Sequence, residues 1–126
     1  MSPTNSLPQE ITVLQEISSA VVHQKDVTAL LYGILDVLNR RMGMLRGTFT
    51  LLQGDTLVIE ASHGLDAAER ELGRYRIGEG ITGHVAETGK SHVVPDIRND
   101  NRFLNRTKSR NYNRQVAFIC VPIIFL

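Results

Sequence analysis

Three glycines within residues 75–97 constrain the fold more than any other feature of this sequence. Gly78, Gly80 and Gly83 have the spacing G-x-G-x-x-G, which in dinucleotide-binding domains follows a buried parallel strand. Here arginines interrupt the preceding residues, and the helix that follows spans only about two turns. Such a helix is too short to return the chain to a parallel strand. Asp96 lies near the spacing of a ribose-binding acid, but we favour a structural role for the glycines.

The structural interpretation gives each glycine a place in a turn–helix–turn arrangement. Gly78 and Gly80 allow a sharp turn with positive φ, and Gly83 allows the short helix at 81–88 to pack closely on its neighbour. Gly89 then ends the helix with a left-handed cap. Together these positions predict the wall of a pocket.

Composition restricts the class of protein. The chain has 126 residues, 42% of them hydrophobic, and a net charge of +1, so we expect one folded domain without a general affinity for nucleic acid or anionic membranes. The single cysteine, Cys120, excludes an intrachain disulfide and, within an apolar run, favours an inert core thiol. No apolar stretch reaches about 18 residues, and no signal peptide is recognisable, so we expect a cytoplasmic location.

Hydrophobic periodicity predicts helices first and strands afterwards, an α+β order with antiparallel pairing. The expected elements are a disordered segment at 1–6, helices at 7–24 and 27–42, a hairpin at 46–62, a helical turn at 67–73, and strands at 91–95 and 116–125.

The glycine spacing and the residues after it resemble the GAF domain, a small-molecule sensor module of signalling proteins. The residues that carry the resemblance are Gly78-Glu79-Gly80-Ile81-Thr82-Gly83, Val85, Glu87-Thr88-Gly89, Val94, Pro95-Asp96-Ile97, Asp100, Arg102-Phe103 and Val121-Pro122. From about Ile11 to Ile123, the chain is most similar to the amino-terminal GAF domain of NifA-type sigma-54-dependent transcriptional activators.

This resemblance implies a GAF (PAS-like) fold, in which a central antiparallel sheet is flanked by helices. Residues 1–126 would be a single GAF domain, with its core at 27–126. Because GAF domains normally continue with one more strand and a C-terminal helix, we expect the chain to be truncated before these two elements.

The resemblance also implies a regulatory function rather than catalysis. The domain would sense a metabolite or a partner and control an attached AAA+ ATPase and DNA-binding portion. The input would be a small anionic ligand such as 2-oxoglutarate, or a nitrogen-status signalling protein. The alternatives are a GAF module of a sensor kinase or cyclase, which would bind a cyclic nucleotide or another small molecule, and a dimerisation scaffold without a ligand.

Pattern and resemblance together predict the ligand pocket. Its expected residues are Phe49, Tyr75, Ile81, Thr82, Val93, Phe103 and Phe118, with Arg102 or Arg106 as anion contacts. Residues 98–114 hold six basic residues and one acid, and we expect an irregular loop that Asp100 and Phe103 anchor to the core. This loop has three possible roles: a solvated surface loop, a wall that attracts an anionic ligand, or an arm that binds nucleic acid. The last role is the least favoured.

The first helix has more apolar surface than one contact requires. One seam consists of Leu7, Ile11, Leu14 and Val21, and a second of Val13, Ile17 and Val22. We expect the first seam to form a homodimer interface, unless the C-terminal helix of a longer chain covers it.

Metal binding and catalysis find little support in the sequence. The four histidines include no tight ligand pair completed by acids or a cysteine. Ser62 and His63 are adjacent on a strand, so their side chains point to opposite faces and cannot cooperate. For His84 we favour a solvated side chain over a ligand contact, because histidine commonly lies at the surface.

Overall fold

The computed structural model describes residues 8–105 and 115–124. The chain divides into two compact units, which we treat one at a time: residues 1–49 with 60–64, and residues 50–59 with 65–126.

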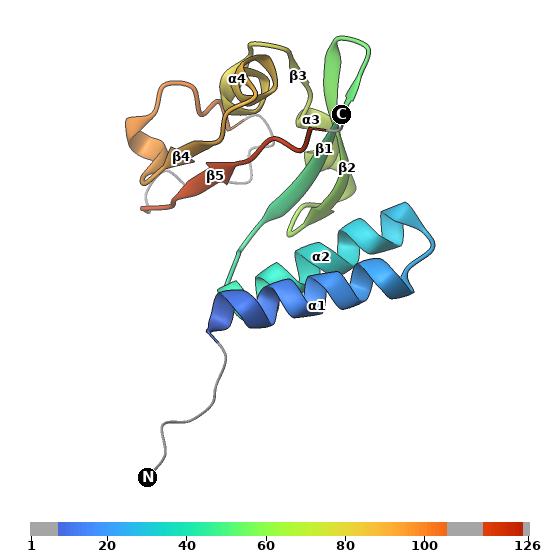
Figure 1. Cartoon of the computed structure of the whole chain (residues 1–126). Helices are drawn as coiled ribbons and strands as arrows, with labels where there is room; N and C mark the ends of the chain where they lie inside the picture. Colours follow the sequence, from blue (N-terminus) through green and yellow to red (C-terminus); the bar gives the residue numbers. More distant parts are fainter. Residues whose placement is uncertain (1–7, 106–114, 125–126) are drawn as a thin grey trace. The chain divides into compact units, whose positions relative to one another are not determined.

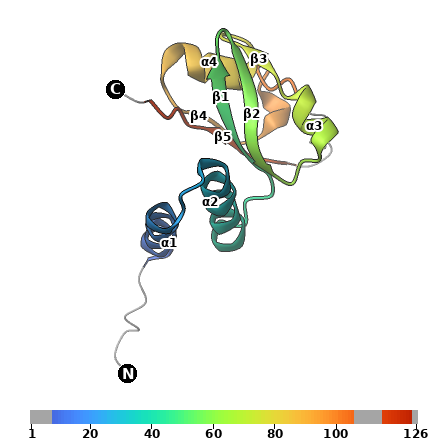
Figure 2. The ribbon, with the colours of Figure 1, turned by 90° about the vertical axis from the view of Figure 1, so that its right-hand side faces the viewer.

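In the first unit, helices α1 (Gln9–His23) and α2 (Val27–Met42) lie side by side, as Figure 1 and Figure 2 both show. The Glu16 carboxylate joins them, because it accepts hydrogen bonds from Arg41 Nε at 2.7 Å and Arg40 Nη2 at 3.2 Å. These two arginines hold the pKa of Glu16 below its ordinary value, Arg41 more strongly. The ion pairs thus fix the register of the two helices.

Helix α2 begins and ends where its sequence signals predict. The Asp26 carboxylate accepts a hydrogen bond from Thr28 N at 3.0 Å, as an N-cap residue does. Gly43, with φ of 67°, supplies the left-handed C-cap. Leu35 and Val37 are the buried residues of the helix.

Two antiparallel sheets follow. Strands β1 (Gly47–Gln53) and β2 (Thr56–His63) form a hairpin, and β3 (Tyr75–Arg76) pairs with β2 through Thr56↔Arg76 and Leu57↔Tyr75. In the second unit, β4 (His92–Val94) pairs with β5 (Phe118–Cys120), with Val93 opposite Ile119. The expected α+β class with antiparallel pairing is confirmed, and the doubly wound nucleotide fold is excluded.

The second unit also holds α3 (Ala67–Leu72), α4 (Gly80–Thr88) and the 3₁₀ turn η1 (Ile97–Asn99). Its core consists of the buried Ile81, Val85, Val94 and Ile97, with Phe103, Val116, Phe118 and Cys120 packed against them. Residues 115–123 alternate between more and less exposed positions, although only 118–120 form a strand.

The glycine motif closes the turn between β3 and α4. Gly78 and Gly80 have φ of 91° and 60°, and the Gly78 amide donates to the Gly83 carbonyl at 2.9 Å. A Cβ at Gly83 would lie 2.3 Å from the Arg76 carbonyl oxygen. Gly89 caps α4 with φ of 68°. The structural role predicted for the glycines is confirmed.

We predict that Gly83→Ala destabilises the domain by about 2 kcal/mol or more, because backbone must move to admit the methyl group. Gly33→Ala is the matched control: Gly33 also lies within a helix, but nothing lies within 4 Å of the added Cβ. The control should stabilise the domain by about 0.5–1 kcal/mol. Urea unfolding of the two variants measures both effects, and similar changes of one sign would contradict the close approach.

Candidate functional site

The residues predicted to line a ligand pocket are spread over six segments. Phe49 lies on β1, Tyr75 on β3, Ile81 and Thr82 on α4, Val93 on β4, Phe118 on β5, and Arg102 and Phe103 in the loop after η1. Phe49 belongs to the first unit and the other seven to the second. Arg106 lies outside the described residues, as does Leu7 of the predicted dimer seam.

Three of the predicted pocket residues pack together in the core of the second unit. Phe103 and Phe118 meet edge to face with ring centroids 5.2 Å apart, and both pack on the cluster that contains Ile81. Val93 is 62% exposed, opposite the exposed Ile119. Tyr75 lies over the start of α4, where its ring would be 3.1 Å from a Cβ at Gly80. A ligand pocket around these residues remains a prediction.

Cys120 is the last residue of β5, where it is half-buried, lies opposite His92 of β4 and packs against the core cluster. Burial raises the pKa of its thiol, and a hydrogen bond with Thr82 opposes this effect only in part. Because the thiolate is the nucleophilic form, the protonated thiol is poorly reactive at neutral pH. This geometry agrees with the inert core thiol expected from the sequence.

A histidine–aspartate pair anchors the loop that follows η1. His92 Nε2 donates to Asp100 Oδ2 at 2.9 Å, and both side chains are largely buried. Asp100 Oδ1 accepts from Arg102 N at 2.8 Å, while its carbonyl accepts from Phe103 N at 3.2 Å. The anchoring role predicted for Asp100 and Phe103 is confirmed. No spacing signal pointed to His92.

Three further observations concern titratable groups. The ring of His84 is half-buried and meets the His92 ring edge to face, with centroids 5.9 Å apart. Among the described residues, no three His, Cys, Asp or Glu side chains are arranged to hold a metal ion. The Asp96 carboxylate binds Arg98 N and its guanidinium, which holds the pKa of Asp96 below its ordinary value.

We predict that Asp100→Asn destabilises the domain in a pH-dependent way. The hydrogen bond from His92 is the main reason why the folded-state pKa of Asp100 lies below its ordinary value of 3.8. A lowered folded pKa means that the pair stabilises the fold above the unfolded pKa and loses this effect as pH falls through the folded pKa. The stability difference between wild type and variant should therefore be largest near neutral pH and shrink below about pH 4.

Urea unfolding at several pH values measures that difference. Asp55→Asn, a change of the same type at the exposed hairpin turn, is the control. A difference for Asp100→Asn that is independent of pH would contradict the role given to the carboxylate.

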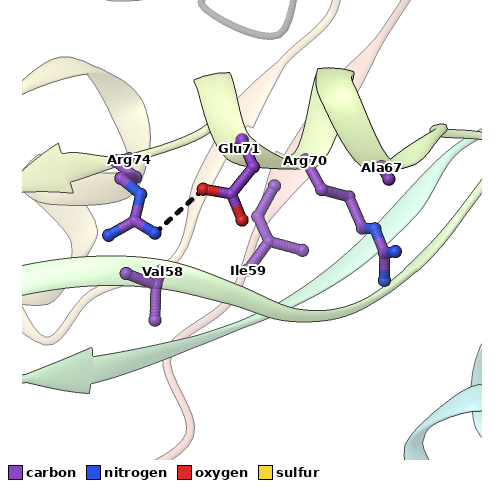
Figure 3. A pocket seen from close by; sticks show the side chains of 6 residues that line it. All are labelled: Val58, Ile59, Ala67, Arg70, Glu71 and Arg74. Atoms are coloured by element: carbon purple, nitrogen blue, oxygen red, sulfur yellow. Dashed lines mark hydrogen bonds and ion pairs between the residues drawn. The ribbon is translucent and has the colours of Figure 1, made fainter.

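A cleft lies between α3 and β2 in the second unit, as Figure 3 shows. Its volume is about 240 Å³, and its lining residues are Val58, Ile59, Ala67, Arg70, Glu71 and Arg74. Sequence reasoning missed this cleft, because alternating charges on a short helix are typical of a solvated surface.

Comparison with known proteins identifies the class. The sequence profile of the GAF domain matches residues 26–125, so this chain belongs to the GAF domain family. No helix among residues 8–105 and 115–124 combines the length and apolar character needed to cross a membrane.

The curated proteins most similar in sequence identify a narrower group within this family. The chain is 40% identical over 119 residues to nitrogen fixation protein VnfA of Azotobacter vinelandii, which covers 90% of this chain and 23% of that protein. It is 33% identical over 121 residues to the Nif-specific regulatory protein of Herbaspirillum seropedicae, covering 94% of this chain and 22% of that one. The chain thus spans less than a quarter of the length of these relatives. The resemblance to NifA-type regulators is confirmed.

Solved structures support the fold. The A. aeolicus nlh2 GAF domain in an inactive state has a TM-score of 0.79 and 27% identity, over 91% of this chain and 70% of that one. Free methionine-R-sulfoxide reductase of Neisseria meningitidis has a TM-score of 0.65 at 24% identity, over 80% and 62%. Because this fold also serves an enzyme, the fold alone does not decide between regulation and catalysis.

Proposed function

We propose that this chain is the regulatory input domain of a NifA-type transcriptional activator of nitrogen-fixation genes. The observation that carries the proposal is 33–40% identity to such regulators over at least 90% of the chain. In this role the domain senses a small molecule or a partner protein and controls an AAA+ ATPase and DNA-binding portion outside these residues. The role requires no catalysis by the domain, and it places the protein in the cytoplasm.

The input in this proposal is a small anionic ligand, with 2-oxoglutarate as the first candidate. The site is the pocket predicted from the sequence, and Arg102 is its anion contact among the described residues. Its residues within the second unit are Tyr75, Ile81, Thr82, Val93, Phe103 and Phe118. One feature supports this choice: Asp100 holds the Arg102 amide at 2.8 Å, which fixes the backbone from which the guanidinium extends. A nitrogen-status signalling protein is the alternative input.

We predict that 2-oxoglutarate at millimolar concentration raises the melting temperature of the domain, because a ligand of the folded state alone stabilises it by RT ln(1 + [L]/Kd). Arg102→Gln should remove most of the shift, since it deletes the proposed anion contact. Lys25→Gln, which removes one positive charge between α1 and α2, should leave the shift intact.

Differential scanning calorimetry over a ligand titration provides the measurement, with cyclic nucleotides tested in parallel. A shift for a cyclic nucleotide alone would favour a generic GAF sensor. No shift for any ligand, in a folded domain, would favour a partner protein or a scaffold.

We further propose that the domain forms a homodimer through α1. Val13 is 5% exposed and packs inside the first unit, whereas Leu14 is 62% and Val21 50% exposed, and Ile11 is also exposed. These three lie on one seam of the helix, so an apolar stripe is left for a second copy. Val22, which the sequence assigns to the other seam, is exposed as well. Packing of two such helices could transmit a ligand-induced change to an output portion.

We predict that the double variant Leu14→Glu and Val21→Glu is a folded monomer, since the charges are soluble on a free surface but unpaired in an interface. Leu45→Glu is the matched control, because Leu45 is equally exposed but lies off α1. Sedimentation velocity decides the state. A double variant that remains dimeric places the contact elsewhere, and one that unfolds assigns the seam to the core of the domain.

A further inference from the structure

The cleft between α3 and β2 shares no residue with the pocket predicted from the sequence. All six of its lining residues belong to the second unit, so its geometry is internal to that unit. It is therefore a separate feature, and it calls for its own chemical interpretation.

Local capping fixes the helix that forms one wall of the cleft. The Asp66 carboxylate accepts from Glu69 N at 2.7 Å, and the Glu69 carboxylate accepts from Asp66 N at 3.0 Å. At the other end, Gly73 N donates to the Arg70 carbonyl at 3.1 Å. A helix of six residues has little stability of its own, so these caps determine where its side chains project.

Cationic groups occupy both ends of the cleft. Figure 3 shows Arg70 on one side of Glu71 and Arg74 on the other, with Ile59 between them. The lining side chains include two guanidinium groups and one carboxylate. A guanidinium presents a planar fork of donors that matches a carboxylate, so an anion of this kind suits the cleft.

Glu71 shows that a carboxylate fits beside Arg74. Its Oε2 lies 3.0 Å from Arg74 Nη2, and the two side chains are 74% and 55% exposed. An exposed pair contributes little to stability and is screened by salt. An external carboxylate could therefore take the place of Glu71 at small cost, while Glu71 would remain free to turn into solvent.

We propose that this cleft is a carboxylate-binding site in which Glu71 is a built-in competitor for Arg74. The ligand group is a carboxylate, supplied either by a small dicarboxylate or by a Glu side chain of a partner protein. In Figure 3 the Ile59 side chain lies between β2 and α3, and its apolar surface suits the methylene groups that both sources carry. The proposal does not depend on the role in nitrogen fixation.

The test follows backbone amide shifts of the domain by NMR during titration with succinate and, separately, with a capped tetrapeptide that contains two glutamates. Saturable shifts at Ala67, Arg70 and Glu71 are expected for at least one of them. Arg74→Gln should weaken binding about tenfold, and Glu71→Gln should tighten it about threefold. Tighter binding by Glu71→Gln cannot result from damage to the fold, so this variant distinguishes competition from misfolding. Lys90→Gln, a loss of one positive charge on an exposed residue at the end of α4, should change nothing.

The two ligands distinguish the source of the carboxylate. Saturation by succinate identifies a free metabolite, and saturation by the peptide alone identifies a protein partner. The proposal is overturned if sodium chloride at equal ionic strength produces the same shifts, if Arg74→Gln binds as wild type does, or if Glu71→Gln binds no more tightly. Shifts confined to α4 and β5 would assign the carboxylate to the other pocket, and would also overturn it.

Discussion

The approach of Gly83 to the Arg76 carbonyl is the contact on which much of the second unit depends. With no side chain at position 83, α4 starts directly against the end of β3, and the Gly78 amide reaches the Gly83 carbonyl. This fixes where Ile81 and Val85 enter the core, and with them the cluster against which β5 packs. A methyl group at that position would move the helix, and every contact of its apolar face would move with it.

Hydrogen bonds and ion pairs of charged side chains then position the loop after η1 and join helices α1 and α2. Asp100 ties the loop after η1 to β4 through His92, and Asp96 binds Arg98 at the start of the same turn. In the first unit, Glu16 performs a similar task between α1 and α2. Partly buried groups of this kind do more to specify geometry than to raise stability, because desolvation offsets much of their attraction.

The fold alone does not determine the function. The chain resembles Nif-specific regulatory proteins in sequence and a free methionine-R-sulfoxide reductase in fold, so the class of protein rests on the relatives and the chemistry on particular side chains. Burial raises the pKa of the Cys120 thiol, which disfavours the nucleophilic thiolate. What the second unit offers instead is positive charge close to apolar surface, both in the loop of Arg102 and at α3. We propose recognition of an anion at both places.

Local signals predicted the fold wherever a single residue sets the backbone. Asp26 and Gly43 marked the ends of α2, and Gly78, Gly80 and Gly89 marked the turns around α4, because capping and positive φ are properties of one or two residues. Alternating and helical periodicity predicted the antiparallel hairpin and the two N-terminal helices, because each pattern lies within one continuous segment. Family resemblance added the name of the fold.

Tertiary structure decided which residues meet. The pairing of His92 with Asp100, the cleft between α3 and β2, and the exposure of Leu14 beside the buried Val13 involve distances across elements, which periodicity does not encode. For the same reason, three aromatic or aliphatic residues predicted to line a pocket were found packed together, since an apolar residue in a core and one in a pocket have the same pattern in sequence. The sequence by itself determined the turns, the caps and the class of fold. Only packing in three dimensions determined which charges became partners and which surfaces remained exposed.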